Sequence, residues 1–250
     1  MRWTILLTLL GCGSVRVRPY PTPTMHNFSE VLQARGIQSL RAETRSDVRL
    51  GKDRAKVTVL MLLQRGGRLR FLAQNPNHTT AAELASNGER YCFLDANHNC
   101  GECGSATPEN VARLIRLVLP PADIVMALFG GTPVLEDAPT TLEWDAKRAM
   151  EHVVLRAPNR VQHVWLKQER SGFNVHESAV EDGSGKVLWR IRHKDFHTLA
   201  KGVALPRRSL FEQGKESILI QWKTQEINIE VRPEQFQLEL PKGLPLCAVQ

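Results

Sequence analysis

Most of the chain alternates apolar and polar residues with a period of two, which is the pattern of half-buried β-strands. Two such runs are separated by Gly66 and Gly67, residues that suit a tight hairpin turn. The apolar positions of this hairpin are Val57, Val59, Met61, Leu63, Leu69, Phe71 and Ala73. The pattern therefore predicts antiparallel strands joined by short turns.

The same pattern continues to the end of the chain. Turn signals at Asn87-Gly88 and at residues 182–185 separate further runs. Leu60 and Leu62 lie between the inward positions of the first hairpin, so we expect some strands to be apolar on both faces. We expect roughly ten strands. The later ones are residues 91–94, 141–144, 153–156, 161–167, 173–180, 187–192, 218–222 and 227–231.

Residues 107–130 break the period of two and form a helical insert. Thr107 is a good N-cap with proline at the first helical position, and this helix stops at a Pro-Pro pair, residues 120–121. A second helix, residues 122–129, is apolar nearly all round and ends at two glycines. A helix pair of this kind needs an apolar surface to cover.

One short helix precedes the strands. Asn27 is its expected cap, and it ends near Gly36. The chain is 42% hydrophobic and 24% charged, which is ordinary for a domain with one core. We therefore expect a mainly β protein with short helices (α+β), in which residues 27–250 form a single domain.

The first residues resemble the signal peptide and lipobox of a bacterial lipoprotein. Arg2 precedes an apolar run, residues 3–10, that is too short to span a bilayer. Gly11 and Cys12 close this run. By resemblance, residues 1–11 would be removed and Cys12 would become the lipidated N-terminus. The alternatives are an ordinary signal peptide and a buried N-terminal strand.

Residues 12–26 are expected to tether the domain to a membrane through that lipid. Three alternating prolines in this segment favour an extended chain. In the lipoproteins that the N-terminus resembles, Asp directly after the lipidated cysteine commonly marks the inner membrane, and Gly13 stands there instead. The expected location is therefore the outer membrane, facing the periplasm.

A net charge of +7 raises the question of an acidic partner. Surfaces that bind nucleic acid interleave basic residues with aromatic stacking platforms, and the arginines of this chain do not follow that pattern. We expect no nucleic-acid partner, and we assign the charge to solvated strand faces close to anionic lipid.

Four cysteines remain when Cys12 is set aside: Cys92, Cys100, Cys103 and Cys247. An even number suits two disulfides in an oxidising compartment, with their connectivity left open. His98 beside the C-x2-C pair leaves a metal or redox module as an alternative. A second pair of zinc ligands is missing from the sequence, so we expect disulfides, no metal and no cofactor.

Catalytic motifs are missing from the sequence. Neither G-x-S-x-G nor H-E-x-x-H nor G-x-G-x-x-G occurs, and residues 183–186 lack the first glycine and the hydroxyl residue of a phosphate loop. The paired carboxylates lie in turns, where solvated acidic residues are routine. The sequence therefore predicts a protein that is not an enzyme.

Taken in order, these elements resemble the LolA/LolB lipoprotein-carrier fold and the outer-membrane lipoproteins that share it. The similar stretches are residues 68–71 after the Gly-Gly turn, 86–91, 94–95, 104, 107–110, 128–133 and 236–243. Together they cover most of residues 36–243. They are a pattern of strands and turns, so they indicate the fold more strongly than the function.

The resemblance implies a curved antiparallel half-barrel whose apolar concave side holds acyl chains beneath a helical lid. The residues that would line or gate this cavity are Leu114, Leu117, Ile124, Leu128 and Phe129. The expected function is non-catalytic binding of an acyl chain or a lipoprotein in envelope biogenesis. If the helices fill the barrel, the alternative is an interaction protein of an envelope complex without ligand transport. The cysteine loop as a metal or redox module is the third possibility.

Overall fold

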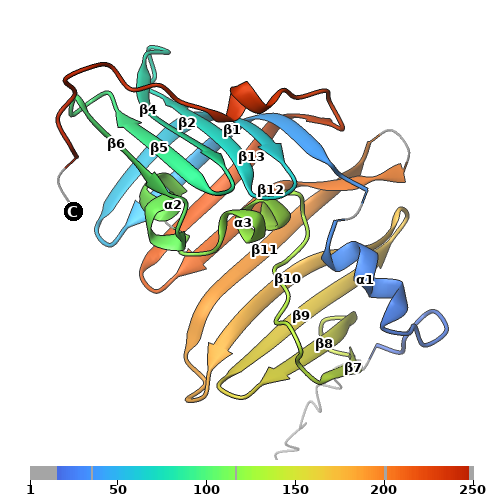
Figure 1. Ribbon diagram of the computed structural model, residues 1–250. Coiled ribbons are helices and arrows are strands. Elements are labelled where there is room, and N and C mark those ends of the chain that lie inside the picture. The colour runs from blue at the N-terminus through green and yellow to red at the C-terminus, as the bar shows by residue number, and fades with distance from the viewer. Residues whose placement is uncertain (1–15, 35, 116, 200–201, 248–250) are drawn as a thin grey trace, which may run out of the picture.

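The computed structural model describes residues 16–34, 36–115, 117–199 and 202–247 (Figure 1). In this part of the chain, thirteen strands form one antiparallel sheet in the order β6-β5-β4-β3-β2-β1-β13-β12-β11-β10-β9-β8-β7. The strands are β1 (Ser39–Leu50), β2 (Asp53–Gln64), β3 (Arg68–Gln74), β4 (Thr80–Asn87), β5 (Arg90–Asp95), β6 (Cys100–Ser105), β7 (Thr140–Asp145), β8 (Met150–Ala157), β9 (Arg160–Glu169), β10 (Gly172–Asp182), β11 (Val187–Thr198), β12 (Ala204–Gln213) and β13 (Glu216–Ile227).

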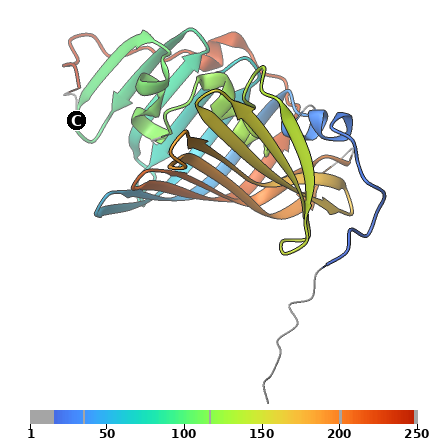
Figure 2. The same ribbon diagram turned by 90° about the horizontal axis from the view of Figure 1, so that it is seen from below.

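The strand order determines where the helices lie. Every neighbouring pair of strands except β1 and β13 is consecutive in the sequence, so the two edge strands are β6 and β7. Because these two strands also follow one another along the chain, the segment that joins them must cross from one edge of the sheet to the other. This segment contains α2 (Pro108–Ile115) and α3 (Pro121–Leu128). Figure 2 shows the sheet as an open trough with both helices on its inner side.

Two hydrophobic clusters cover the inner face. The larger one joins α3 and the α2–α3 linker to strands such as β2, β3 and β13, with Phe71, Ile124 and Leu128 among its members. In the smaller one, Phe28 and Leu32 of α1 (His26–Leu32) pack on β8, β9 and β10. The expected mainly β fold, a half-barrel with a helical lid, is confirmed. No helix in the described residues has the length and apolar character needed to cross a bilayer.

Several boundaries differ from the sequence-based expectation. Nine of the ten expected strands form, and four strands lie outside the expected ranges: β1, β4, β6 and β12, whose sequences are rich in small, polar or charged residues. The predicted strand at residues 227–231 is wrong, because β13 ends at Ile227. The next residue, Asn228, has a φ of 56°, and its side chain bonds Gln38 N at 2.7 Å and Gly36 O at 2.9 Å, which turns the chain away.

Helix α1 begins one residue before the predicted cap. Its N-cap position is Met25, and Asn27 lies in the first turn. The Asn27 Oδ1 atom accepts hydrogen bonds from the backbone N and the hydroxyl of Thr24, at 2.8 and 3.0 Å. Asn27 therefore stabilises the chain ahead of the helix instead of capping it.

The described part of the proline-rich segment packs against β7 and β8. Arg18 donates to both carboxylate oxygens of Glu151, with Nε and Nη2 at 2.7 and 3.0 Å, and the Glu151 side chain is fully buried. Burial and the neighbouring Glu151 raise the pKa of Tyr20 to about 12. The Trp144 ring donates from Nε1 to Arg16 O at 2.7 Å. From Arg16 onward, the expected tether is therefore held on the sheet by a buried ion pair.

Replacing Glu151 by glutamine leaves the guanidinium of Arg18 without its counter-charge. We expect Glu151→Gln to lower the free energy of unfolding by about 2–4 kcal/mol, measured by urea denaturation. The matched control is Glu226→Gln in the exposed pair with Arg41, 3.5 Å apart, where the change should stay within about 0.5 kcal/mol. Equal small losses in both variants would contradict a structural role for the buried pair.

Candidate functional site

A cavity of about 970 Å³ lies between the inner face of the sheet and the two lid helices. Its walls come from β1 to β6, β12 and β13, and its cover comes from α2, α3 and the linker between them. The larger apolar side chains that line it are Val48, Leu50, Val57, Val59, Met61, Phe71, Phe93, Leu117, Val118, Ile124, Leu128, Phe211, Ile218, Ile220 and Leu246.

Small side chains at inward positions leave this space unfilled. Ala73 of β3 and Ala82 of β4 are directly opposite each other in neighbouring strands, and both line the cavity. Ala112 does the same from α2. Leucine or phenylalanine at such positions would fill the trough, because protein interiors otherwise pack to the density of organic crystals. The hollow is therefore a consequence of the sequence.

The structure brings three of the five predicted cavity residues to the lining: Leu117, Ile124 and Leu128. Phe129 is buried outside the lining, where its ring centroid lies 5.8 Å from the guanidinium carbon of Arg65. The side chain of Leu114 lies outside the described residues, and so does Cys12. Sequence reasoning missed the wall residues of β2 and β13, although their period of two had already marked them as inward.

Polar side chains line part of the cavity, and we call the part beside the β5–β6 turn and the edge strand β6 the mouth. Asp95, Asn97 and His98 come from the β5–β6 turn, Glu109 and Asn110 from the start of α2, and Glu216 from the start of β13. Asp95 accepts hydrogen bonds from the backbone N of His98 at 3.0 Å and pairs with its Nδ1 at 2.8 Å. Among the described residues that line the cavity, none is lysine or arginine.

The chain after α3 crosses the inner face without regular structure, so its polar backbone groups need partners. Thr132 N donates to Leu32 O at 2.9 Å, and the Thr132 hydroxyl bonds Ser178 at 2.8 Å. Gln162 donates to Pro133 O at 2.6 Å and accepts from Leu135 N at 3.0 Å. These bonds explain why polar residues occupy buried positions on the inner face.

His193 holds the end of the lid from the sheet side. It is fully buried, with Nδ1 at 2.9 Å from the Ser209 hydroxyl and Nε2 at 3.4 Å from Gly131 O. Trp222 donates to the same hydroxyl at 3.0 Å. Burial lowers the pKa of His193 to about 4. Gly131 leaves no room for a side chain, because a Cβ there would lie 2.5 Å from Leu32 O.

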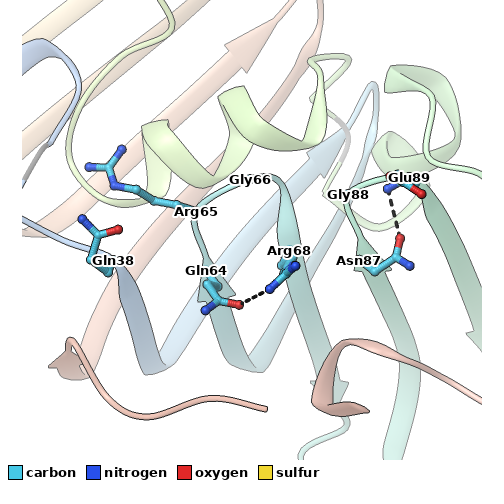
Figure 3. A pocket seen from close by; sticks show the side chains of 8 residues that line it. All are labelled: Gln38, Gln64, Arg65, Gly66, Arg68, Asn87, Gly88 and Glu89. Atoms are coloured by element: carbon cyan, nitrogen blue, oxygen red, sulfur yellow. Dashed lines mark hydrogen bonds between the residues drawn. The ribbon is translucent and has the colours of Figure 1, made fainter. Parts of the chain in front are cut away.

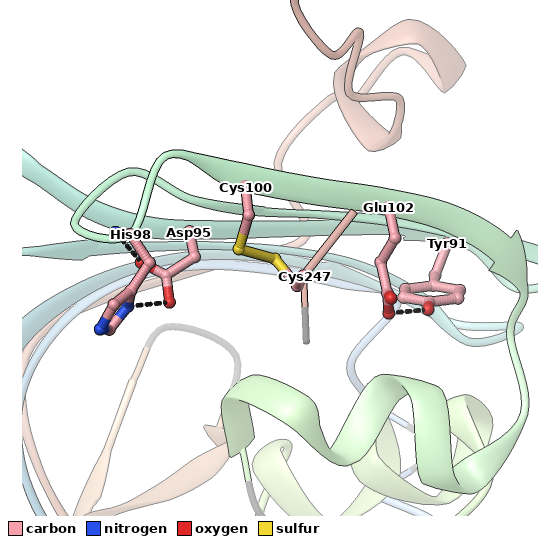
Figure 4. The surroundings of a disulfide bond; sticks show 6 residues. All are labelled: Tyr91, Asp95, His98, Cys100, Glu102 and Cys247. Atoms are coloured by element: carbon pink, nitrogen blue, oxygen red, sulfur yellow. Dashed lines mark hydrogen bonds and ion pairs between the residues drawn. A yellow bond between two sulfur atoms is a disulfide. The ribbon is translucent and has the colours of Figure 1, made fainter. Parts of the chain in front are cut away.

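Both predicted disulfides form, and the structure supplies their pairing. Cys92 bonds Cys103, its direct partner across β5 and β6, and Cys100 bonds Cys247 near the C-terminus. Figure 4 shows the second disulfide above α2, close to Asp95 and His98. With their sulfur atoms in two different disulfides, Cys100 and Cys103 are not thiolate ligands and do not form a C-x2-C disulfide with each other, so the structure gives the metal or redox alternative no support.

A second hollow of about 460 Å³ lies outside the lid, at the β2–β3 and β4–β5 turns (Figure 3). Its lining is polar and includes Arg65 and Arg68. Arg65 donates to the carbonyls of Ile37, at 2.6 Å, and Gln33, at 2.8 Å, and Arg68 bonds Gln64 at 3.0 Å. Arg65 therefore holds the chain between α1 and β1, and Arg68 bonds within the β2–β3 hairpin, so we interpret this hollow as structural.

Neither a family model nor a curated protein sequence matches the chain. By structure it is similar to a LolA superfamily protein from Nitrosomonas europaea, with a TM-score of 0.57 and 12% identity over 85% of this chain and 97% of that one. A domain described as an outer membrane lipoprotein-sorting protein, from Vibrio parahaemolyticus, gives 0.56 and 8% over 80% and 89% of the two chains. A DUF1329 family protein from Desulfovibrio piger gives 0.57 and 10% over 87% and 98%.

At these identities the likeness is one of fold. It covers most of this chain and nearly all of each of those proteins, so the whole described domain shares their architecture. The protein therefore has a LolA/LolB-like fold: an open antiparallel half-barrel with helices on its concave side.

The buried imidazole of His193 makes the free energy of unfolding depend on pH. Its pKa is about 4 in the folded protein and 6.5 as an ordinary value, so the stability it contributes is complete above pH 6.5 and is lost as the pH falls toward 4. Between pH 7 and pH 4, the free energy of unfolding of the natural protein should fall more than that of His193→Gln, by on the order of 3 kcal/mol. Urea denaturation at a series of pH values measures this, and parallel curves would contradict it.

Proposed function

We propose that this protein is a periplasm-facing, outer-membrane-anchored lipoprotein that binds acyl chains, free or carried by a lipoprotein, without catalysing a reaction. The single observation that carries the proposal is the apolar cavity under the lid. A volume of about 970 Å³ lies at the upper end of the roughly 300–1,000 Å³ usual for small-molecule sites. Its deep end, between α3, β2 and β13, is apolar, which suits a hydrocarbon chain and no charged group.

The mouth narrows the class of ligand. Three carboxylates, those of Asp95, Glu109 and Glu216, line the cavity, and the described lining contains neither lysine nor arginine. A free fatty acid would add a fourth carboxylate to this acidic lining, and like charges repel. We therefore infer that the chain is carried on an ester or amide, as it is in an acylated lipoprotein, and that the uncharged linkage lies at the mouth.

The anchor would hold the domain with its mouth away from the membrane. Residues 16–20 contact β7 and β8, at one edge of the sheet, whereas the mouth lies beside β6, at the other edge. In both views, the first described residues and the C-terminal end lie on opposite sides of the molecule (Figures 1 and 2). If Cys12 carries lipid, it is four residues from Arg16, at most about 14 Å of extended chain. A ligand would then arrive from the periplasm.

The likeness to LolA superfamily and lipoprotein-sorting structures supports lipid or lipoprotein binding as the use of this cavity. The second candidate function is an interaction protein of an envelope complex that binds no ligand. That function needs no hollow interior, and the volume left open by the small lining residues favours the first candidate.

Filling the cavity tests the proposal. Val57 and Thr58 are neighbours in β2, but Val57 lines the cavity and Thr58 faces the other side of the sheet. We expect Val57→Trp to weaken binding of a fluorescent monoacylglycerol at least tenfold by occupying space, and Thr58→Trp to leave the affinity within twofold. Fluorescence titration of the delipidated, refolded protein measures both.

A direct comparison of headgroups tests the ligand class. At neutral pH, a fluorescent fatty acid with the same chain should bind more weakly than the monoacylglycerol, because its carboxylate meets the acidic mouth. If the natural protein and both tryptophan variants take up neither probe, acyl binding is wrong and the interaction protein stands. Equal affinity for the two probes would contradict only the inference about the linkage.

A further inference from the structure

The C-terminal strap, which we define as residues 237–247, follows a route that ends at the cavity. It begins after η2 (Pro233–Phe236), a 3-10 turn that packs against β3 and β4 through the buried side chain of Phe236. Arg70 of β3 donates to Gln235 O at 3.2 Å at this point. The strap then runs to the edge strand β6 and around it (Figure 1).

Close packing and a backbone hydrogen bond attach the strap to β6. Gly101 N donates to Pro245 O at 2.9 Å. A Cβ on Gly101 would lie 2.6 Å from the side chain of Leu244 and 3.0 Å from Phe93 O, so a larger residue there would require the strap or β6 to shift. The strap thereby covers part of an edge whose backbone groups would otherwise be open to another chain.

The disulfide between Cys100 and Cys247 fixes the last described residue of the strap at the mouth. Figure 4 shows this bond between β6 and α2, next to Asp95 and His98. Pro245, Leu246 and Cys247 all line the cavity. The strap is therefore part of the cavity wall, and a covalent bond joins it to β6, which also lines the cavity through Cys100.

Two apolar side chains that line the cavity are exposed to solvent. The large hydrophobic residues that the described part of the chain leaves exposed are Val17, Leu60, Val118 and Leu246. Val118 of the α2–α3 linker, 41% exposed, and Leu246 of the strap, 79% exposed, both line the cavity. An apolar side chain held in water at the mouth of an apolar cavity gains most when a ligand covers it.

We propose that Leu246 is a ligand contact and that the Cys100–Cys247 disulfide holds it over the mouth, so that the strap slows the escape of a bound chain. This inference rests on the proposed function, since it assigns a retaining wall to the same cavity. The hydrocarbon of a bound acyl chain would contact Val118 on one side and Leu246 on the other as it leaves the interior. Loss of either Leu246 or the disulfide removes that wall while the rest of the cavity stays intact.

The experiment measures the rate at which a bound fluorescent monoacylglycerol leaves when an excess of unlabelled monoacylglycerol is added. The test variants of the full chain are Leu246→Ala and the double variant Cys100→Ser with Cys247→Ser. Their matched controls are Leu60→Ala, an exposed leucine on the outer face, and Cys92→Ser with Cys103→Ser, which removes the other disulfide of the same hairpin. Circular dichroism confirms the fold of each variant.

We expect both test variants to release the probe about tenfold faster and both controls to stay within twofold of the natural protein. Release at the natural rate from either test variant that binds the probe overturns the proposal. Faster release from the controls by the same factor also overturns it, because the effect would then be general loosening of the fold. If the double variant does not fold, the comparison of Leu246→Ala with Leu60→Ala decides. If the natural protein never takes up the probe, the proposed function itself fails, and this inference fails with it.

Discussion

The connection between β6 and β7 determines the character of this molecule. These strands are consecutive in the sequence and lie at opposite edges of a thirteen-stranded sheet, so the segment between them has to cross the trough. An apolar inner face exposed to water would be unstable, and this crossing segment covers much of it. Helix α3 contributes Ile124 and Leu128 to the cover, and the irregular chain after it reaches β7.

Polar side chains fix one end of the crossing chain to the sheet, and small side chains leave a space beneath its other end. Gln162, Ser178 and His193 supply hydrogen bonds where the chain after α3 lies against the inner face. Beneath the helices, Ala73 and Ala82 leave the sheet recessed. One end of the trough is therefore tightly joined, while the other encloses an apolar space whose mouth carries carboxylates. An apolar interior with a polar mouth suits a protein that encloses the hydrocarbon end of a ligand and leaves its polar end near solvent.

The sequence alone predicts those parts of the fold that depend on local pattern. The β2–β3 hairpin was predicted because its own residues alternate, and α2 begins at Pro108 as its cap indicates. Strand β6 could not be predicted, since its glycines and cysteines join the sheet through pairing with β5. The role of Phe129 was missed for a similar reason: it follows the last turn of α3, where the chain directs it toward Arg65. Disulfide pairing depends on strand register and on the path of the strap.

The position of a bound acyl chain can be measured in a crystal structure of the protein grown with a monoacylglycerol that is brominated near the end of its chain. If the cavity holds an acyl chain, we expect an anomalous bromine peak deep in the cavity, between Met61 of β2 and Leu128 of α3, with the glycerol at the mouth near Asp95. A cavity that side chains fill, or bromine bound only on the outer surface, would contradict the claim that this half-barrel is built to hold an acyl chain.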